Sequence, residues 1–205
     1  MVWKGENMKT LIAIPCMDMM HTMFVRSLLG MGIVGECEIT FSMSSLVYDA
    51  RNTLALKAIN EKFDRVLWLD SDMTFRPDLF TKLSEHLDNG LEFVSGLYMT
   101  RKPKYKPCLF KSIGPGKADF MLEYPKDQLF EIVGCGFGCV MMTTDLIREV
   151  GDKFGYPFSP LMGIGEDLTF CHYVGKLGKK LYCDSRLKLG HVGFMEITEE
   201  TFLKG

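Results

Sequence analysis

The chain has 205 residues, of which 47% are apolar and 24% are charged, a composition that excludes disordered, collagen-like and supercharged chains. This length allows one domain with a sizeable core. The 24 Lys and Arg residues against 26 Asp and Glu residues give a net charge of −2. No global positive field therefore exists to hold a phosphate backbone, and we expect no nucleic-acid partner.

Cysteine usage and hydropathy bound the compartment. Seven cysteines, an odd number without a Cys-x-x-Cys pair, argue against a disulfide framework and a structural zinc site. The longest apolar run is too short for a membrane span, and the polar first residues lack the apolar stretch of a signal peptide. We therefore expect reduced thiols and a cytoplasmic location. Residues 1–7 are expected to be an N-terminal extension ahead of a single domain at 8–205.

The first half of the chain reads as alternating strands and helices. Residues 10–14 form an unbroken apolar run that stops at Pro15, and residues 37–43 alternate in polarity; both patterns indicate strands. Apolar residues then recur at helical spacing from 47 to 59 and again from 79 to 87, on either side of the apolar strand 65–69. This βαβαβα order predicts a doubly wound layer.

The second half, residues 101–205, has a different character. After a predicted strand near 91–99 come clustered basic residues, prolines and short strands with Gly-rich turns, which indicate a mixed, partly antiparallel region. Thr144 is predicted to cap a helix from Asp145 to Val150 that Gly151 ends, and a second helix is predicted from Glu166 to about residue 177. A last strand near 181–183 precedes a Gly-His pair at 190–191.

Asp70-Ser71-Asp72 follows the apolar strand 65–69 directly. The carboxyl ends of parallel strands are where open α/β sheets bind ligands. Residues one apart on an extended chain point to opposite sides, so one acid is free to hold a divalent cation while the other reaches a ribose or a water. A solvated turn is the alternative interpretation of this motif.

Two later motifs carry further candidate groups. Glu166 and Asp167 stand at a predicted helix start, where acids are favoured by the helix dipole; a carboxylate there is also suited to act as general base. His191 follows an apolar strand and is either a hydrogen-bonded structural residue or a metal ligand with Asp72. An imidazole in that set favours manganese over magnesium.

In this order and spacing, the motifs resemble the glycosyltransferases of the GT-A fold, closest to family-2-like members with an Asp-x-Asp motif. The resemblance runs from Thr10 to about Gly193. It rests on an opening strand that ends in Pro15 and on these segments: Ala50-Arg51-Asn52, Leu67-Trp68-Leu69-Asp70-Ser71-Asp72, Gly134-Cys135-Gly136-Phe137-Gly138, Gly165-Glu166-Asp167-Leu168 and Gly190-His191.

The resemblance implies a single α/β domain with a Rossmann-like mixed central sheet flanked by helices. Within it, residues 8–100 would be the nucleotide-binding half, and residues 101–205 would bind the acceptor and complete the metal site. It also implies transfer of a sugar, with inversion, from a UDP- or GDP-linked donor to a hydroxyl of a glycan or another acceptor, with Mn²⁺ or Mg²⁺ as cofactor. Asp167 would be the catalytic base with Glu166 beside it, and Asp72 and His191 would bind the metal with Asp70. The donor would contact these positions: Pro15, Cys16, Arg51, Asn52, Asp70, Ser71 and Gly136.

Some features depart from the family or have ordinary explanations. Many family-2 members carry an acid after the second strand, where this chain has Ser42-Met43-Ser44-Ser45. Asn52 fits an ordinary polar helix face, and the glycines at 134–138 fit a bulged strand as well as close approach of a donor sugar. A sugar nucleotidylyltransferase and a non-catalytic nucleotide-sugar-binding domain remain alternative interpretations. A further interpretation is that the chain is one domain of a longer polypeptide.

Overall fold

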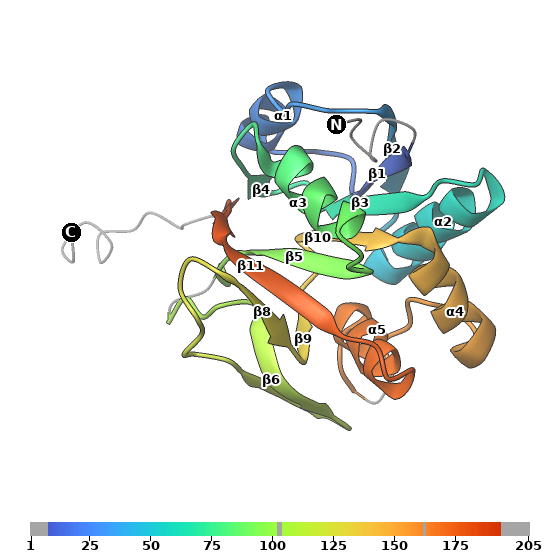
Figure 1. Cartoon of the computed structure of the whole chain (residues 1–205), viewed down its shortest axis with the longest axis vertical. Helices are drawn as coiled ribbons and strands as arrows, with labels where there is room; N and C mark the ends of the chain where they lie inside the picture. Colours follow the sequence, from blue (N-terminus) through green and yellow to red (C-terminus); the bar gives the residue numbers. More distant parts are fainter. Residues whose placement is uncertain (1–7, 102–103, 162, 194–205) are drawn as a thin grey trace.

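The computed structural model describes residues 8–101, 104–161 and 163–193, which form a mixed α/β fold. Their central sheet has seven strands in the order β2-β1-β3-β10-β5-β11-β8 (Figure 1). β1 is parallel to β2 and β3, and β5 is parallel to β11, whereas β10 and β8 run antiparallel to their neighbours. The strands are β1 (Lys9–Cys16), β2 (Glu36–Met43), β3 (Arg65–Leu69), β5 (Phe93–Leu97), β8 (Leu129–Ile132), β10 (Cys139–Thr143) and β11 (Leu181–Lys188).

Helices cover both faces of this sheet and bury two apolar clusters (Figure 1). One face packs against α2, α4 and α5, and the other against α1 and α3. β1 and β3 are buried along their whole apolar runs because helices lie on both sides of them. The helices are α1 (Thr22–Leu29), α2 (Val47–Asn60), α3 (Leu79–Asp88), α4 (Thr144–Phe154) and α5 (Glu166–Lys176). The predicted mixed sheet flanked by helices is confirmed.

Two smaller sheets complete the described part of the chain. β6 (Leu109–Gly114) pairs with β7 (Lys117–Phe120) and β9 (Gly134–Cys135). β4 (Met73–Thr74), directly after the Asp-x-Asp segment, pairs antiparallel with β12 (Gly190–His191). The second pairing brings the last described residues back to the end of β3.

Several predicted boundaries were wrong. β1 continues through Pro15 to Cys16, because Pro15 is paired beside the edge strand β2 and not within a doubly hydrogen-bonded interior. The hydroxyl that caps α4 is that of Thr143, which accepts from the Leu146 amide, and the helix runs past Gly151 to Phe154. Helix α1 was not predicted from the sequence. The predicted extension at 1–7 lies outside the described residues.

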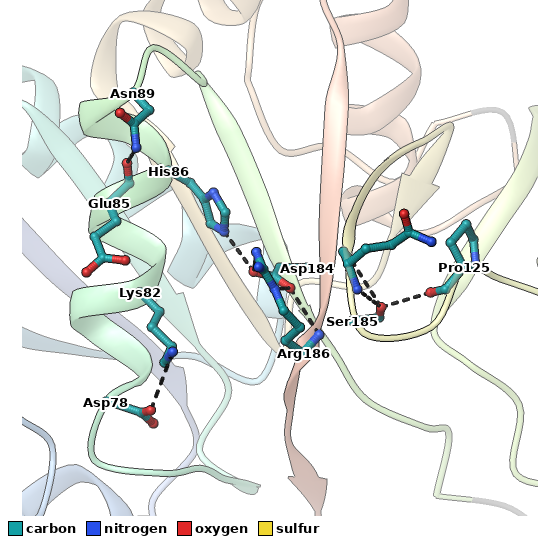
Figure 2. A network of polar contacts seen from close by, with 10 residues as sticks. Asp78, Lys82, Glu85, His86, Asn89, Pro125, Asp184, Ser185 and Arg186 are labelled. Atoms are coloured by element: carbon teal, nitrogen blue, oxygen red, sulfur yellow. Dashed lines mark hydrogen bonds and ion pairs between the residues drawn. The ribbon is translucent and has the colours of Figure 1, made fainter.

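A buried carboxylate ties α3 to β11 (Figure 2). Asp184 accepts hydrogen bonds from His86 Nε2 at 2.8 Å and from Arg186 Nε and Nη2 at 2.8 and 2.7 Å. Burial acts to raise the pKa of Asp184, but the bonds from Arg186 and His86 outweigh it and hold the pKa at about 2. The next residue, Ser185, donates to the Pro125 carbonyl at 2.8 Å. β11 is thus anchored on both sides, just before the chain continues into β12, which pairs with β4.

Candidate functional site

The Asp-x-Asp segment forms a tight turn at the carboxyl end of β3. The Asp70 amide donates to the Gly138 carbonyl at 3.1 Å, and the Met73 amide donates back to the Asp70 carbonyl at 3.1 Å. β1 and β2, which are parallel to β3 through the sheet, end at the same edge. The two acids therefore lie at the carboxyl edge of these parallel strands, the edge at which open α/β sheets bind ligands.

Asp72 and His191 meet although they lie far apart in sequence. Pairing of β12 with β4 sets His191 opposite Met73, and the Val192 amide donates to the Asp72 carbonyl at 2.8 Å. His191 Nε2 lies 3.5 Å from Asp72 Oδ2, and Arg101 Nη1 lies 2.7 Å from the same oxygen. The other oxygen, Asp72 Oδ1, is buried and has no hydrogen-bond partner.

The imidazole of His191 is oriented by its second nitrogen. Nδ1 lies 2.8 Å from the Met99 carbonyl; a carbonyl only accepts, so Nδ1 carries the hydrogen and Nε2 of the neutral ring presents its lone pair towards Asp72. Metal-binding histidines are commonly fixed in this way. Burial lowers the pKa of His191, but the Asp72 carboxylate and the Met99 carbonyl reverse this and leave it raised. Burial raises the pKa of Asp72, but His191 and Arg101 outweigh it and leave it lowered.

These groups fit a divalent cation that completes its coordination with non-protein ligands. Within residues 8–101, 104–161 and 163–193, no three acidic, histidine or cysteine side chains converge as a metal site. Asp72 and His191 nevertheless offer an unpartnered buried carboxylate oxygen and an imidazole lone pair. Cations that act on phosphates are held by one or two carboxylates together with phosphate oxygens and waters. The donor set is therefore suitable for a metal bound with a diphosphate.

Asp70 is turned towards Arg51 and not towards His191. Arg51 Nη2 lies 2.8 Å from Asp70 Oδ1, and Arg51 Nε lies 3.2 Å from Glu166 Oε1. The arginine side chain is 3% exposed and its guanidinium lies 5.7 and 5.5 Å from the rings of Trp68 and Phe137. Burial acts to lower the pKa of Arg51, but Asp70 and Glu166 reverse this and raise it. Arg51 therefore joins the Asp-x-Asp turn to the start of α5.

Asn52 has a structural partner for each polar atom of its amide. Nδ2 donates to the Phe158 carbonyl at 2.6 Å, and Oδ1 accepts from the Phe158 amide at 3.1 Å. These two bonds hold the segment between α4 and α5 against α2. The nucleotide contacts expected for Arg51 and Asn52 stay predictions, and both side chains already have a packing role.

Asp167 is the second residue of α5, next to Glu166, and is partly buried. Its Oδ1 accepts from the Leu168 amide at 2.7 Å. Burial, reinforced by the charge of Glu166, raises the pKa of Asp167 to about 6, against the opposing effects of the Leu168 amide and Arg51. A Cβ on Gly136 would lie 3.6 Å from Asp167 Oδ2, so the predicted base and the Gly-rich segment are neighbours.

Tyr98 explains the glycines of this segment. Its hydroxyl accepts from the Gly138 amide at 2.9 Å, and a Cβ on Gly138 would lie 2.8 Å from the Tyr98 ring, closer than any side chain tolerates. A Cβ on Gly136 would also collide with the Tyr98 hydroxyl. Both glycines thus allow the backbone to pack on Tyr98, whose ring meets His191 edge-on at 5.4 Å between centroids.

An open pocket of about 330 Å³ lies at this edge of the sheet. Its wall contains six of the predicted positions: Pro15, Cys16, Asp70, Ser71, Asp72 and His191. Arg51, Asn52, Gly136, Glu166 and Asp167 are not part of its wall. Six further residues of the wall were not predicted from the sequence: Met17, Ser44, Ser45, Val47, Ala50 and Arg101. Of these, Ser44 and Ser45 follow a predicted strand, which is a signal that could have found them.

No protein-family model matches the chain, and no curated protein matches it in sequence. Among solved structures, GalNAc-T7 with UDP, GalNAc and Mn²⁺ is similar, with a TM-score of 0.65 and 11% identity over 94% of this chain and 45% of that chain. A197 from STIV is similar with a TM-score of 0.64 and 22% identity, over 92% of this chain and 87% of that chain. The chain has a GT-A-like fold.

The Mn²⁺ and UDP named for GalNAc-T7 belong to that protein, and identities this low establish the GT-A-like fold and not the chemistry. This chain spans less than half of GalNAc-T7. Among its described residues, no helix has the length and apolar character needed to cross a membrane.

Proposed function

We propose that this protein is a metal-dependent glycosyltransferase that moves a sugar from a UDP- or GDP-linked donor to an acceptor hydroxyl with inversion. The observation that carries this proposal is the Asp72 carboxylate at a pocket on the carboxyl edge of the sheet, with Oδ1 unpartnered and Oδ2 3.5 Å from the oriented Nε2 of His191. Buried side-chain polar atoms in folded proteins normally have a hydrogen-bond partner, so the unpartnered Oδ1 indicates a role beyond structure.

Asp72 and His191 would hold the cation, Mn²⁺ in preference to Mg²⁺ because of the imidazole. The metal supplies a Lewis acid that stabilises the charge on the leaving diphosphate. Asp70, with Oδ1 fixed by Arg51, would direct its other oxygen to a ribose hydroxyl or a metal-bound water. Pro15, Cys16 and Ser71 line the same pocket and would contact the nucleoside diphosphate, and Gly136 would lie near the transferred sugar.

Asp167 would take the proton from the hydroxyl of a glycan or of another acceptor. A pKa of about 6 leaves this carboxylate mostly ionised at neutral pH and more basic than an ordinary aspartate, as a general base requires. Glu166 raises that pKa and is itself held by Arg51. The ion pairs through Arg51 would thus fix the distance between the donor end and the base end of the site.

The test is incubation with a panel of UDP- and GDP-sugars, Mn²⁺ and simple glycan acceptors. Release of nucleoside diphosphate supports transfer, and inversion is checked from the anomeric configuration of the product. Release of pyrophosphate would instead indicate a nucleotidylyltransferase. Donor binding without turnover of any acceptor, in an assay that scores hydrolysis as well, would favour a non-catalytic binding domain.

The cytoplasmic location belongs to the same proposal. All seven cysteines are unpaired, and four of them are buried. Thiol titration of protein purified without reductant should find seven free thiols. Fewer would contradict a reducing compartment.

A further inference from the structure

The Asp72 carboxylate is already paired with a positively charged side chain of the protein itself, the guanidinium of Arg101. Arg101 Nη1 is 2.7 Å from Asp72 Oδ2, and the arginine side chain is 50% exposed. Arg101 had no role predicted from the sequence, yet it lines the pocket together with Asp72 and His191. Its guanidinium keeps its charge at any physiological pH.

The position of Arg101 conflicts with that of a divalent cation. Arg101 Nη1 and His191 Nε2 both approach Asp72 Oδ2, at 2.7 and 3.5 Å. An ion that used both Asp72 and His191 would lie within a few ångströms of the guanidinium. Like charges at that separation repel strongly even at an intermediate dielectric, and because Arg101 cannot lose its proton, it has to leave Asp72 when the ion binds.

The surroundings of Arg101 permit this movement. Its backbone is fixed on the N-terminal side, where the Thr100 amide donates to the Lys106 carbonyl at 2.8 Å and the Lys106 amide donates to Thr100 Oγ1 at 3.0 Å. Its aliphatic stem passes Gly193, where an added Cβ would be 3.5 Å from the stem. The half-exposed guanidinium is held by Asp72 alone among the described hydrogen bonds and ion pairs.

We propose that Arg101 and the divalent cation compete for Asp72, and that a nucleoside diphosphate ends this competition by binding Arg101. A guanidinium pairs with phosphate oxygens in a bidentate manner, and Arg101 lies in the wall of the pocket where the proposed function places the diphosphate. The inference rests on that proposed function. Its consequence is that metal alone binds weakly, whereas metal and nucleoside diphosphate each strengthen the binding of the other.

The experiment is calorimetric titration of Mn²⁺ into the wild type and Arg101→Gln, first alone and then in the presence of UDP or GDP. We expect Arg101→Gln to bind Mn²⁺ alone about tenfold more tightly, and to bind the nucleoside diphosphate in saturating Mn²⁺ about tenfold more weakly. A residue with only a structural role would not move the two affinities in opposite directions. Arg76→Gln is the matched control, because Arg76 is an exposed arginine paired with Asp78 outside this pocket, and both affinities should equal those of the wild type.

Asp72→Asn separates the two proposals. If Asp72→Asn loses Mn²⁺-dependent binding of the diphosphate while Arg101→Gln leaves the affinity for Mn²⁺ alone unchanged, competition is refuted and the proposed metal site stands. If neither the wild type nor Arg101→Gln binds Mn²⁺ or a nucleoside diphosphate, both ideas are overturned. Opposite shifts in Arg101→Gln, both abolished when Asp72→Asn is added, are the result that supports competition.

Discussion

Two carboxylates in this molecule have the same kinds of partner and different surroundings. Asp184 and Asp72 each lie beside one histidine and one arginine. At Asp184, Oδ1 accepts from the Arg186 amide and Nε, and Oδ2 accepts from His86 Nε2 and Arg186 Nη2, so both oxygens are satisfied. At Asp72, one oxygen has no partner and the histidine is 3.5 Å away.

The difference follows from which acceptor each histidine ring nitrogen faces. His86 uses Nε2 to reach Asp184 at 2.8 Å, whereas His191 directs its Nδ1 hydrogen to the Met99 carbonyl and turns a lone pair towards Asp72. Asp184, His86 and Arg186 form a closed group, in which both carboxylate oxygens are paired. Such a group stabilises a fold, because it leaves no buried polar atom without a partner. At Asp72 the group is open, because one carboxylate oxygen beside a pocket has no partner. The same three residue types therefore make a structural clamp at α3 and β11 and a candidate binding site at β4 and β12.

The largest effect is expected at a third carboxylate, Asp167, whose pKa is raised whereas those of Asp72 and Asp184 are lowered. Asp167→Asn should lower turnover about 10²- to 10⁴-fold and keep donor binding, because the amide has nearly the same shape but cannot accept the proton. In the wild type the rate should fall as the pH drops below about 6, where the base becomes protonated. Steady-state kinetics against pH, with donor binding measured by calorimetry, test this. Near-normal turnover in the variant, or retention of the donor's configuration in the product, would leave Asp167 as a helix-terminus acid.

Asp72→Asn should break the open group without unfolding the protein. We expect the Mn²⁺-dependent affinity for UDP or GDP to fall about 100-fold or more, since loss of a supporting contact alone costs ten- to a hundredfold. The free energy of unfolding should change by less than about 1 kcal/mol, because Asp72 has few satisfied partners to lose. Calorimetry and urea unfolding on the same samples give both quantities. An unchanged nucleotide affinity would refute the metal assignment.

Asp184→Asn should show the opposite pattern. A folded pKa of about 2 against an ordinary value of 3.8 corresponds to about 2 kcal/mol of stability at pH 7. This contribution is complete above the unfolded pKa, near pH 4, and is lost as the pH falls through the folded pKa, near 2. Urea unfolding at pH 7 and at pH 3 should therefore show a smaller difference between wild type and variant at the lower pH.

Asp127→Asn is the control for this variant, because Asp127 pairs with Lys188 of the same strand at 2.9 Å but is well exposed. It should produce no measurable loss of stability. The Mn²⁺-dependent nucleotide affinity should be unchanged in both variants. A loss of nucleotide binding in Asp184→Asn would show that the clamp also shapes the site.

The sequence predicted what depends on local pattern. The buried runs at 10–14 and 65–69 predicted β1 and β3, and the position of Asp70 and Asp72 directly after a buried strand predicted the edge at which they lie. The fold class was predictable because strands and helices alternate along the first half of the chain and each apolar run has the period of its element.

Contacts between residues far apart in the chain could not be predicted from local sequence pattern. The meeting of His191 with Asp72 depends on β4 and β12, strands of two residues each, too short for any periodicity. The orientation of Arg51 into the interior depends on two acids and two aromatic rings from separate elements. Arg101 was missed because its partner is brought to it only by the fold, and Gly136 and Gly138 were interpreted without Tyr98, which packs on them from a distant strand end.

The smallest and most specific effect is expected from a matched pair of histidine variants. Asn places an amide nitrogen near the position of Nδ1 but has nothing at Nε2. His191→Asn should therefore keep the bond to the Met99 carbonyl, retain the stability of the wild type and weaken Mn²⁺-dependent nucleotide binding about tenfold, less than Asp72→Asn, because the metal keeps its carboxylate. His86→Asn removes the Nε2 bond to Asp184 and should lower stability by about 1 kcal/mol with nucleotide affinity unchanged. Calorimetry and urea unfolding of the two variants side by side decide the matter. If both variants lose stability and neither loses affinity, His191 is a structural residue like His86, and the open group at Asp72 would have to bind its cation without an imidazole.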